Sequence, residues 1–328
     1  MKLGILTAPF PDTPLDEVAD WAAGAGFQAL EIACWPQGGG EKRRYAGTAH
    51  LPIEEMTAAR GSEIMASLAN KGLAVSGLGY YPNPLHGDAA HREAVIGHLK
   101  KVITAASLMG VKVVNTFVGG DRTLTVDQNW TRAVEIFAPI VAHARDSGVT
   151  LAFENCPMIF SNDEWPGGHN IAYAPRIWRR IFETWGDAVG MNYDPSHLVW
   201  QMIDAGRFVR EFGARMVHVH AKDLMIDRDG LYDHGILSAG IILAIIVSAQ
   251  RMKARGAKAG VAVDIAIWAV PFGIIGGRLF HVATHLNDYV GAGKNPASIL
   301  YVWEGGLAIY GNQRSPRIRS TSHHTLQL

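Results

Sequence analysis

Residues 149–155 read VTLAFEN, an apolar run that ends on a carboxylate and an amide. Two later stretches have the same form, since residues 188–197 read AVGMNYDPSH and residues 214–223 read ARMVHVHAKD. A short apolar run of this kind is typical of a strand that is buried on both faces, as strands of a parallel sheet are. We therefore interpret the three stretches as parallel strands that each carry polar side chains at the carboxyl end.

The first 240 residues alternate between strand-like and helix-like patterns. Apolar runs predict strands over residues 3–7, 29–34, 74–78, 113–118, 150–154, 189–194 and 216–221. Amphipathic stretches predict helices over residues 15–25, 53–71, 89–109, 126–147, 175–185 and 199–212. Regular alternation of strands with helices indicates an α/β protein built on a parallel sheet.

The polar strand ends decide between a closed barrel and an open, doubly wound sheet. A barrel gathers the ends of many strands around one mouth, whereas an open sheet offers a single crevice. No GxGxxG follows the first strand pattern, which argues against a dinucleotide site. We predict a (β/α)8 TIM barrel that lacks its normal eighth strand, because only seven strand patterns precede residue 240, followed by hydrophobic helices.

Glu154, Asp194 and His220 are the predicted metal ligands. Taken singly, each has a structural explanation: a loop cap, an Asp-Pro turn, or a structural histidine. Because about one βα unit separates each residue from the next, successive strands would bring all three to one mouth. Two carboxylates and an imidazole suit Mn²⁺, Mg²⁺ or Co²⁺, with Zn²⁺ as a further candidate.

Further side chains near these strand ends are predicted to bind substrate. They are His197, Lys222, Asn155 and Trp35, although a tryptophan in a loop is more often plain packing. A lysine at such a site would neutralise negative charge that develops on a substrate oxygen. His218 and His220 lie on the same side of a strand because side chains alternate, so one histidine would bind the metal and the other would orient it.

Residues 1 to about 240 resemble the sugar phosphate isomerase/epimerase family, which are xylose isomerase-like TIM barrels. The pieces that carry the resemblance are FEN at 153–155, DPSH at 194–197 and HVHAKD at 218–223. The resemblance implies a metal-dependent isomerase or epimerase of a sugar or sugar phosphate, working by proton transfer through an enediolate. It implies that Glu154, Asp194 and His220 hold the metal, that Glu154 is catalytic and that His197 binds substrate.

The same family normally has a second catalytic glutamate on its eighth strand. The resemblance ends near residue 240, before any match to that glutamate. Two alternatives therefore stay open beside an impaired enzyme. One is a barrel fragment without catalysis, and the other is a remnant attached to a membrane. An endonuclease of the same superfamily is disfavoured, because it would need more histidine ligands and a basic face.

Beyond residue 240 the chain becomes strongly apolar, with IILAIIV at 241–247 and a longer run over 261–282. Such runs fit either buried helices or membrane segments, since the first is shorter than the ~20 residues of a spanning helix and the second contains Asp264 and Arg278. The basic residues that follow the first run are typical of the cytoplasmic side of a span.

Residues 241–311 are similar to the amino-terminal third of prolipoprotein diacylglyceryl transferase, a bacterial inner-membrane enzyme. The matching pieces are DIAIWAVPFG at 264–273, GGRLFHV at 276–282 and WEGGLAIYG at 303–311. The resemblance implies membrane association through residues 236–282. We expect three parts: a truncated barrel over 1–240, a membrane-helix-like segment over 241–311 and a disordered tail over 312–328.

The composition of the chain limits which partners and which cellular location can be expected. The 328 residues include 30 basic and 30 acidic side chains, and this zero net charge gives no reason to expect a nucleic acid partner. Two distant cysteines, Cys34 and Cys156, fit a reducing cytosol better than a disulfide scaffold. We expect no signal peptide. The predicted location is therefore a cytoplasmic barrel, either free or held at the inner (plasma) membrane by the C-terminal segment.

Overall fold

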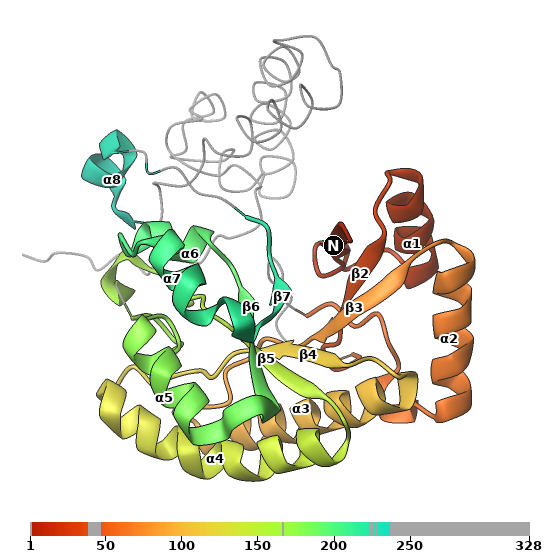
Figure 1. Cartoon of the computed structure of the whole chain (residues 1–328), viewed down its shortest axis with the longest axis horizontal. Helices are drawn as coiled ribbons and strands as arrows, with labels where there is room; N and C mark the ends of the chain where they lie inside the picture. Colours follow the sequence, from red (N-terminus) through yellow and green to blue (C-terminus); the bar gives the residue numbers. More distant parts are fainter. Residues whose placement is uncertain (1, 39–46, 166, 223–225, 227, 237–328) are drawn as a thin grey trace, which may run out of the picture. The chain divides into compact units, whose positions relative to one another are not determined.

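The structure is a computed structural model that describes residues 2–38, 47–165, 167–222, 226 and 228–236. Seven parallel strands form one sheet in chain order and curl into a half-barrel (Figure 1). The strands are β1 (Gly4–Leu6), β2 (Ala29–Ala33), β3 (Ala74–Gly79), β4 (Val113–Thr116), β5 (Thr150–Glu154), β6 (Val189–Tyr193) and β7 (Met216–Val219). The predicted α/β class and all seven predicted strands are confirmed.

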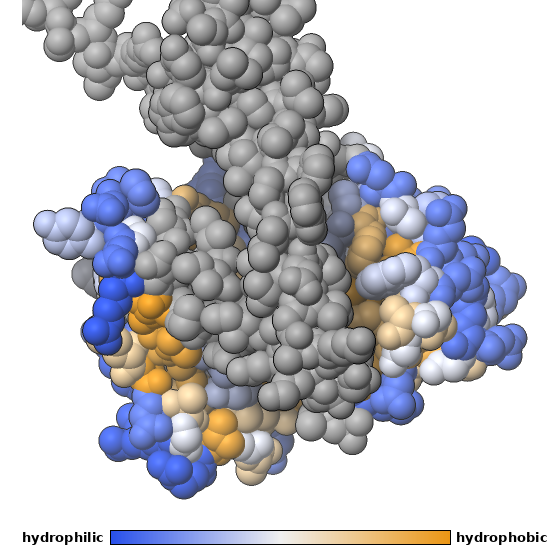
Figure 2. Space-filling view, turned by 90° about the horizontal axis from the view of Figure 1, so that it is seen from above, coloured by the Kyte–Doolittle hydropathy of each residue, from blue (hydrophilic) through white to orange (hydrophobic). Residues whose placement is uncertain are grey.

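Helices follow the strands and cover the outer side of the sheet, as the ring of α2, α3, α4 and α5 in Figure 1 shows. The α-helices are α1 (Leu15–Gly24), α2 (Ala58–Asn70), α3 (Ala89–Met109), α4 (Val126–Asp146), α5 (Pro175–Trp185), α6 (Ser196–Trp200), α7 (Ala205–Phe212) and α8 (Arg228–His234). Short 3-10 turns span Ile53–Glu55, Asn162–Glu164, Gly186–Ala188 and Gly213–Arg215. Figure 2 shows hydrophilic residues along the outer flanks of one face, with apolar residues nearer its middle.

Two predicted helices are each divided into two pieces. The helix predicted over 53–71 is a 3-10 turn followed by α2, which begins where the Thr57 side chain accepts a hydrogen bond from the backbone N–H of Arg60. The helix predicted over 199–212 is α6 followed by α7, and Asp204 caps α7 in the same way through Arg207. Threonine and aspartate favour a helix start over a helix interior because their side chains satisfy the free N–H groups there.

The core lies between the sheet and the outer helices. Phe137 of α4 is fully buried and meets Phe153 of β5 edge-on, with ring centroids 5.2 Å apart. Trp185 at the end of α5 packs against both rings at 5.5 and 5.7 Å. This aromatic group lies directly behind the strand end that carries Glu154, so packing fixes the position of that carboxylate.

The two outermost strands have only one neighbour each in the described part of the chain. Val217 and Val219 of β7 are 44% and 45% exposed, unlike the buried residues of β5 and β6. Among the described residues, β1 and β7 are therefore the open edges of the sheet. The segment 241–247, the predicted hydrophobic helices and the tail 312–328 lie outside the described residues. Across the helices that the structure describes, none has the length and apolarity needed to cross a membrane.

Candidate metal centre

The carboxyl ends of β5, β6 and β7 bring the three predicted ligands together. Glu154 is the last residue of β5, Asp194 directly follows β6 and His220 directly follows β7. One potential ligand atom from each residue lies within 4.8 Å of those of the other two. The two carboxylates are 5% and 0% exposed. Adjacent parallel strands in chain order thus create the juxtaposition that the spacing of the three stretches predicts.

Glu154 presents its two oxygens to different neighbours. Its Oε2 lies 3.5 Å from Nδ1 of His220, and its Oε1 lies 3.3 Å from Nε2 of His197. Burial raises the pKa of the Glu154 carboxyl, but the positive charges of His220 and Lys222 together hold that pKa well below its usual value. Glu154 is therefore ionised and able to accept a proton or bind a cation.

Asp194 is anchored through its backbone and through one of its two oxygens. Asn155 accepts a hydrogen bond from the backbone N–H of Asp194 at 2.7 Å and donates to its carbonyl oxygen at 2.8 Å. Asp194 Oδ1 accepts from the Ser196 hydroxyl at 2.6 Å and from the Ser196 backbone N–H at 3.0 Å. The described contacts of the Asn155 side chain are thus with the backbone of Asp194, beneath the predicted ligands.

The other oxygen of Asp194 faces the site and supports the prediction of a cation. Asp194 Oδ2 lies 2.5 Å from Nζ of Lys222 and 3.2 Å from Nε2 of His197. Neither Asp194 Oδ2 nor His197 Nε2 makes a hydrogen bond of acceptable geometry, although both atoms are buried. These ion pairs place positive charge beside Asp194 Oδ2, where a divalent ion could replace it, and the donor set of Glu154, Asp194 and His220 fits a metal ion.

Lys222 places a positive charge beside both carboxylates. Its side chain is 55% exposed, and its Nζ lies 3.9 Å from Glu154 Oε1 as well as close to Asp194. Burial lowers the pKa of Lys222, whereas Glu154 and Asp194 raise it above the ordinary value for lysine. A charged ammonium here opposes a divalent ion electrostatically, and its exposed, flexible stem allows it to move away.

We expect Lys222→Gln to strengthen Mn²⁺ binding by about threefold to tenfold, because the glutamine removes a like charge from a half-exposed position. Isothermal titration of Mn²⁺ into the two full-length proteins would measure the difference. Lys222→Arg is the matched control, since it keeps the charge and should leave the affinity within about twofold. Weaker binding by the glutamine variant would mean that Lys222 supports the ion instead of competing with it.

A large cavity connects the predicted substrate-binding residues. Its volume is about 1270 Å³, and its lining includes Trp35, Glu154, His197 and Lys222. Trp35 packs against the rings of Tyr80 and Tyr81, with centroids 5.9 and 6.1 Å away, so its position is fixed by aromatic contacts. His197, Lys222 and Trp35 thus share one cavity with two of the predicted metal ligands, Glu154 and His220, whereas Asn155 is fully buried.

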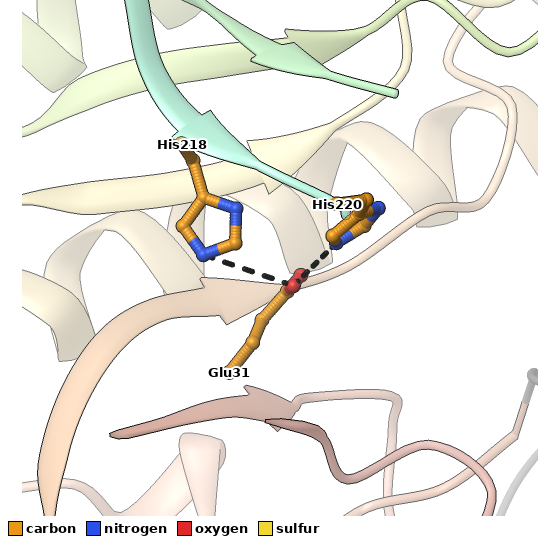
Figure 3. Close-up of side chains that lie close together, drawn as sticks. All are labelled: Glu31, His218 and His220. Atoms are coloured by element: carbon orange, nitrogen blue, oxygen red, sulfur yellow. Dashed lines mark hydrogen bonds and ion pairs between the residues drawn. The ribbon is translucent and has the colours of Figure 1, made fainter. Parts of the chain in front are cut away.

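Glu31 is a site residue that the sequence did not reveal. It lies in the middle of β2 and is 2% exposed. Its Oε2 lies 2.6 Å from Nε2 of His220 and 3.9 Å from Nε2 of His218 (Figure 3). The hydroxyl of Tyr81 donates a hydrogen bond to Glu31 Oε1. The available signal was a single carboxylate inside the apolar run ALEIAC at 29–34, where a charge needs a partner.

Glu31 and His220 form a tightly coupled ion pair. Burial raises the pKa of Glu31, but His220 and His218 more than compensate and lower it to about 2. Burial lowers the pKa of His220, whereas Glu31 and Glu154 raise it to about 10. Glu31, His218 and His220 also form a second group whose ligand atoms lie within 4.8 Å, and Glu154, Cys156 and His197 form a third.

Comparison with known proteins identifies two regions in the chain. The family described as xylose isomerase-like TIM barrel matches residues 19–256, and prolipoprotein diacylglyceryl transferase matches residues 231–313. The C-terminal segment is 54% identical over 72 residues to phosphatidylglycerol–prolipoprotein diacylglyceryl transferase of Rhodococcus jostii, covering 22% of this chain and 20% of that protein. The chain thus spans about a fifth of the length of this curated relative.

Two solved structures share the fold of the barrel region. The probable 3-DHS dehydratase AsbF, involved in petrobactin synthesis in Bacillus anthracis, has a TM-score of 0.54 at 13% identity, covering 78% of this chain and 90% of that one. A D-tagatose 3-epimerase-like protein has a TM-score of 0.53 at 19% identity, covering 79% and 88%. At these identities the likeness establishes the fold, and the two proteins are named for different reactions.

Proposed function

The chain belongs to the xylose isomerase-like TIM barrel family, and we propose that it is a divalent-metal-dependent isomerase or epimerase of a sugar or sugar phosphate. The observation that carries the proposal is the group formed by Glu154, Asp194 and His220. Carboxylate oxygens with one imidazole suit Mn²⁺, Mg²⁺ or Co²⁺, and Zn²⁺ is a further candidate. The oxygen-rich ligand set fits a substrate with several hydroxyl groups.

The side chains around this group have complementary tasks in the proposed reaction. A bound divalent ion would stabilise negative charge on a substrate oxygen as a Lewis acid. Glu154 would accept a proton from the carbon next to a substrate carbonyl and could return it to the neighbouring carbon on the same face, which requires hydrogen-bond reach and an ionised carboxylate. Epimerisation would need a second acid on the opposite face to deliver the proton there. Lys222 and His197 would hold substrate oxygens, with the ammonium neutralising negative charge. Trp35 would pack against the sugar from the cavity wall.

A second candidate function is a barrel fragment without catalysis that the C-terminal segment attaches to the inner membrane. The observation that supports it is the similarity of residues 231–313 to about a fifth of a membrane transferase. The part of the barrel that the structure describes contains no eighth-strand glutamate, the residue that the family resemblance leads one to expect. The proposed division into 1–240, 241–311 and 312–328 belongs to this candidate. Membrane association through 236–282 would be tested by fractionation, and a full-length chain recovered wholly without membranes would exclude the attachment.

We expect the full-length protein to bind one Mn²⁺, Co²⁺ or Mg²⁺ and to become more stable with it. An ion at a hundredfold excess over its dissociation constant adds about 2.7 kcal/mol to the free energy of unfolding. Metal content by mass spectrometry and thermal unfolding with and without EDTA would measure both effects. Absence of bound metal, together with no shift in melting temperature for any of these ions or Zn²⁺, would contradict the proposal.

Turnover separates the two candidate functions. Metal-loaded protein would be incubated with free and phosphorylated ketoses in D₂O, and exchange of the carbon-bound hydrogen next to the carbonyl would be followed by NMR. Deuterium incorporation with a changed sugar configuration supports the enzyme. Metal binding without exchange for any sugar supports the barrel fragment without catalysis.

A further inference from the structure

The imidazole of His220 lies between two carboxylates. Its Nε2 is 2.6 Å from Oε2 of Glu31, and its Nδ1 is 3.5 Å from Oε2 of Glu154. Figure 3 shows the Glu31 carboxylate reaching the His220 ring from β2, across the half-barrel from β7. The nitrogen that faces the predicted metal centre is therefore Nδ1, while Nε2 faces away from it.

We propose that Glu31 is the positioning residue of the metal ligand His220: it accepts the Nε2 hydrogen and so directs the Nδ1 lone pair toward the ion. The inference rests on the proposed metal-dependent function. An ionised carboxylate can only accept, so the short contact keeps a hydrogen on Nε2. A divalent ion would take the place of the hydrogen on Nδ1, which faces Glu154, while the hydrogen that Glu31 accepts stays on Nε2. Metal-binding histidines commonly use such an outer carboxylate, which fixes the tautomer and makes the ligand more basic.

Hydrogen bonding at the other carboxylate oxygen, Oε1, holds Glu31 in place. Tyr81 donates its hydroxyl hydrogen to Glu31 Oε1, and the hydroxyl oxygen accepts from Nδ2 of Asn192 at 3.1 Å. Asn192 Oδ1 lies 2.9 Å from Nδ1 of His218, which donates to it. The carboxylate therefore belongs to a buried network that joins β2, β6 and β7, and such a network restricts the direction in which Glu31 points.

The backbone also makes room for this carboxylate. A Cβ atom on Gly79, the last residue of β3, would lie 2.7 Å from Glu31 Oε1 and 3.0 Å from Cε2 of Tyr81. A side chain at this position would displace the carboxylate from Tyr81. Glycine at the end of β3 is thus a condition for the Glu31 conformation that reaches His220.

A separate metal site at Glu31, His218 and His220 is the competing interpretation. Those residues also bring one ligand atom each within 4.8 Å. However, that site would use Nε2 of His220, which already lies 2.6 Å from Glu31, and Nε2 of His218, which contacts the Ser76 hydroxyl at 3.0 Å. A neutral His220 cannot give a lone pair to both sites. The short contact on Nε2 favours the metal on the Nδ1 side.

The test compares full-length wild type, Glu31→Gln and Tyr81→Phe by Mn²⁺ titration and by NMR of the histidine nitrogens. We expect Glu31→Gln to weaken Mn²⁺ binding by about 10- to 100-fold, which is typical when an outer partner of a ligand is lost. Tyr81→Phe leaves the Glu31 carboxylate present and should weaken binding by only about threefold to tenfold, so it tests the network if the first variant folds poorly. The bound stoichiometry should stay unchanged.

The histidine signals distinguish positioning from a general structural effect. Zn²⁺-loaded wild type, which is diamagnetic, should show His220 with its hydrogen on Nε2 and metal on Nδ1, and Glu31→Gln should reduce the protection of that hydrogen from exchange. Glu211→Gln is the matched control, because Glu211 pairs with Arg179 outside the cavity at 2.6 Å and should change neither readout.

Three outcomes overturn the inference. Equal Mn²⁺ affinity in wild type and Glu31→Gln removes the positioning role. Loss of one of two bound ions, with the affinity of the other unchanged, assigns Glu31 to a site of its own. A metal ion bound to Nε2 of His220 would likewise assign Glu31 to a separate metal site. If wild type binds no ion, the proposed function fails, whereas the protection of the Nε2 hydrogen of His220 from exchange in metal-free protein still shows whether Glu31 holds that hydrogen.

Discussion

Glu154→Gln is expected to reduce turnover by about 10²- to 10⁴-fold, because the amide cannot act as the general base. The same change should weaken Mn²⁺ binding by more than the roughly 10- to 100-fold expected for an outer partner such as Glu31. Both effects have one cause, which is the loss of a buried negative charge at the end of β5, 3.5 Å from the imidazole of His220. The glutamine has nearly the same shape, so the packing behind β5 should be preserved.

Metal titration and hydrogen exchange at the substrate carbon would measure the two losses separately. Glu211→Gln again provides the same chemical change at a carboxylate outside the cavity, and its loss of one partly exposed ion pair should cost at most about 1 kcal/mol. Retention of both Mn²⁺ affinity and turnover in Glu154→Gln would rule out Glu154 as ligand and base. Loss of turnover with intact metal binding would leave Glu154 as a base only.

Phe137→Ala is expected to lower the free energy of unfolding by about 3–5 kcal/mol. Phe137 is 0% exposed and touches both Phe153 and Trp185, so its removal leaves a cavity directly behind the strand that ends at Glu154. That loss is a large fraction of the roughly 5–15 kcal/mol by which ordinary proteins are stable. Metal affinity should fall as well, since the strand end loses its support.

Urea unfolding followed by circular dichroism would measure the loss of stability. Tyr232→Ala in α8 is a suitable aromatic control, because that side chain is 90% exposed and its removal should change the free energy of unfolding by less than about 0.5 kcal/mol. A change below about 1 kcal/mol for Phe137→Ala would show that the surrounding rings collapse into the space or that this region adds little to the cooperative core.

Local sequence signals were sufficient for most of the fold. The helix predicted over 89–109 coincides with α3, because Asp88 caps its start through the N–H of His91 and Gly110 ends it in the left-handed conformation. The divided helices were not predictable from amphipathic spacing, since the same spacing continues through Thr57 and through Asp204. Whether such a residue sits inside a helix or starts a new one depends on tertiary packing.

The predicted ligand group and Glu31 differ in how sequence encodes them. Glu154, Asp194 and His220 end successive strands, so chain order alone places them side by side in a parallel barrel. Glu31 and His220 are separated by 189 residues and come from strands on different sides of the curled sheet. Contact between them depends on the curvature of the sheet and on which face of β2 points inward. The spacing of motifs along the sequence predicts neither of these.

Within the described residues β7 pairs with β6 alone, and this gives the predicted centre a kinetic weak point. His220 directly follows this strand, and its backbone N–H donates to the carbonyl oxygen of Tyr193 in β6 at 2.8 Å. The exposed valines of β7 add little burial, so the described part of this strand belongs to the less protected regions that open without global unfolding. When the end of this strand opens locally, His220 would lose its contact with the ion. The residence time of the metal would then be set by how often this edge of the sheet opens.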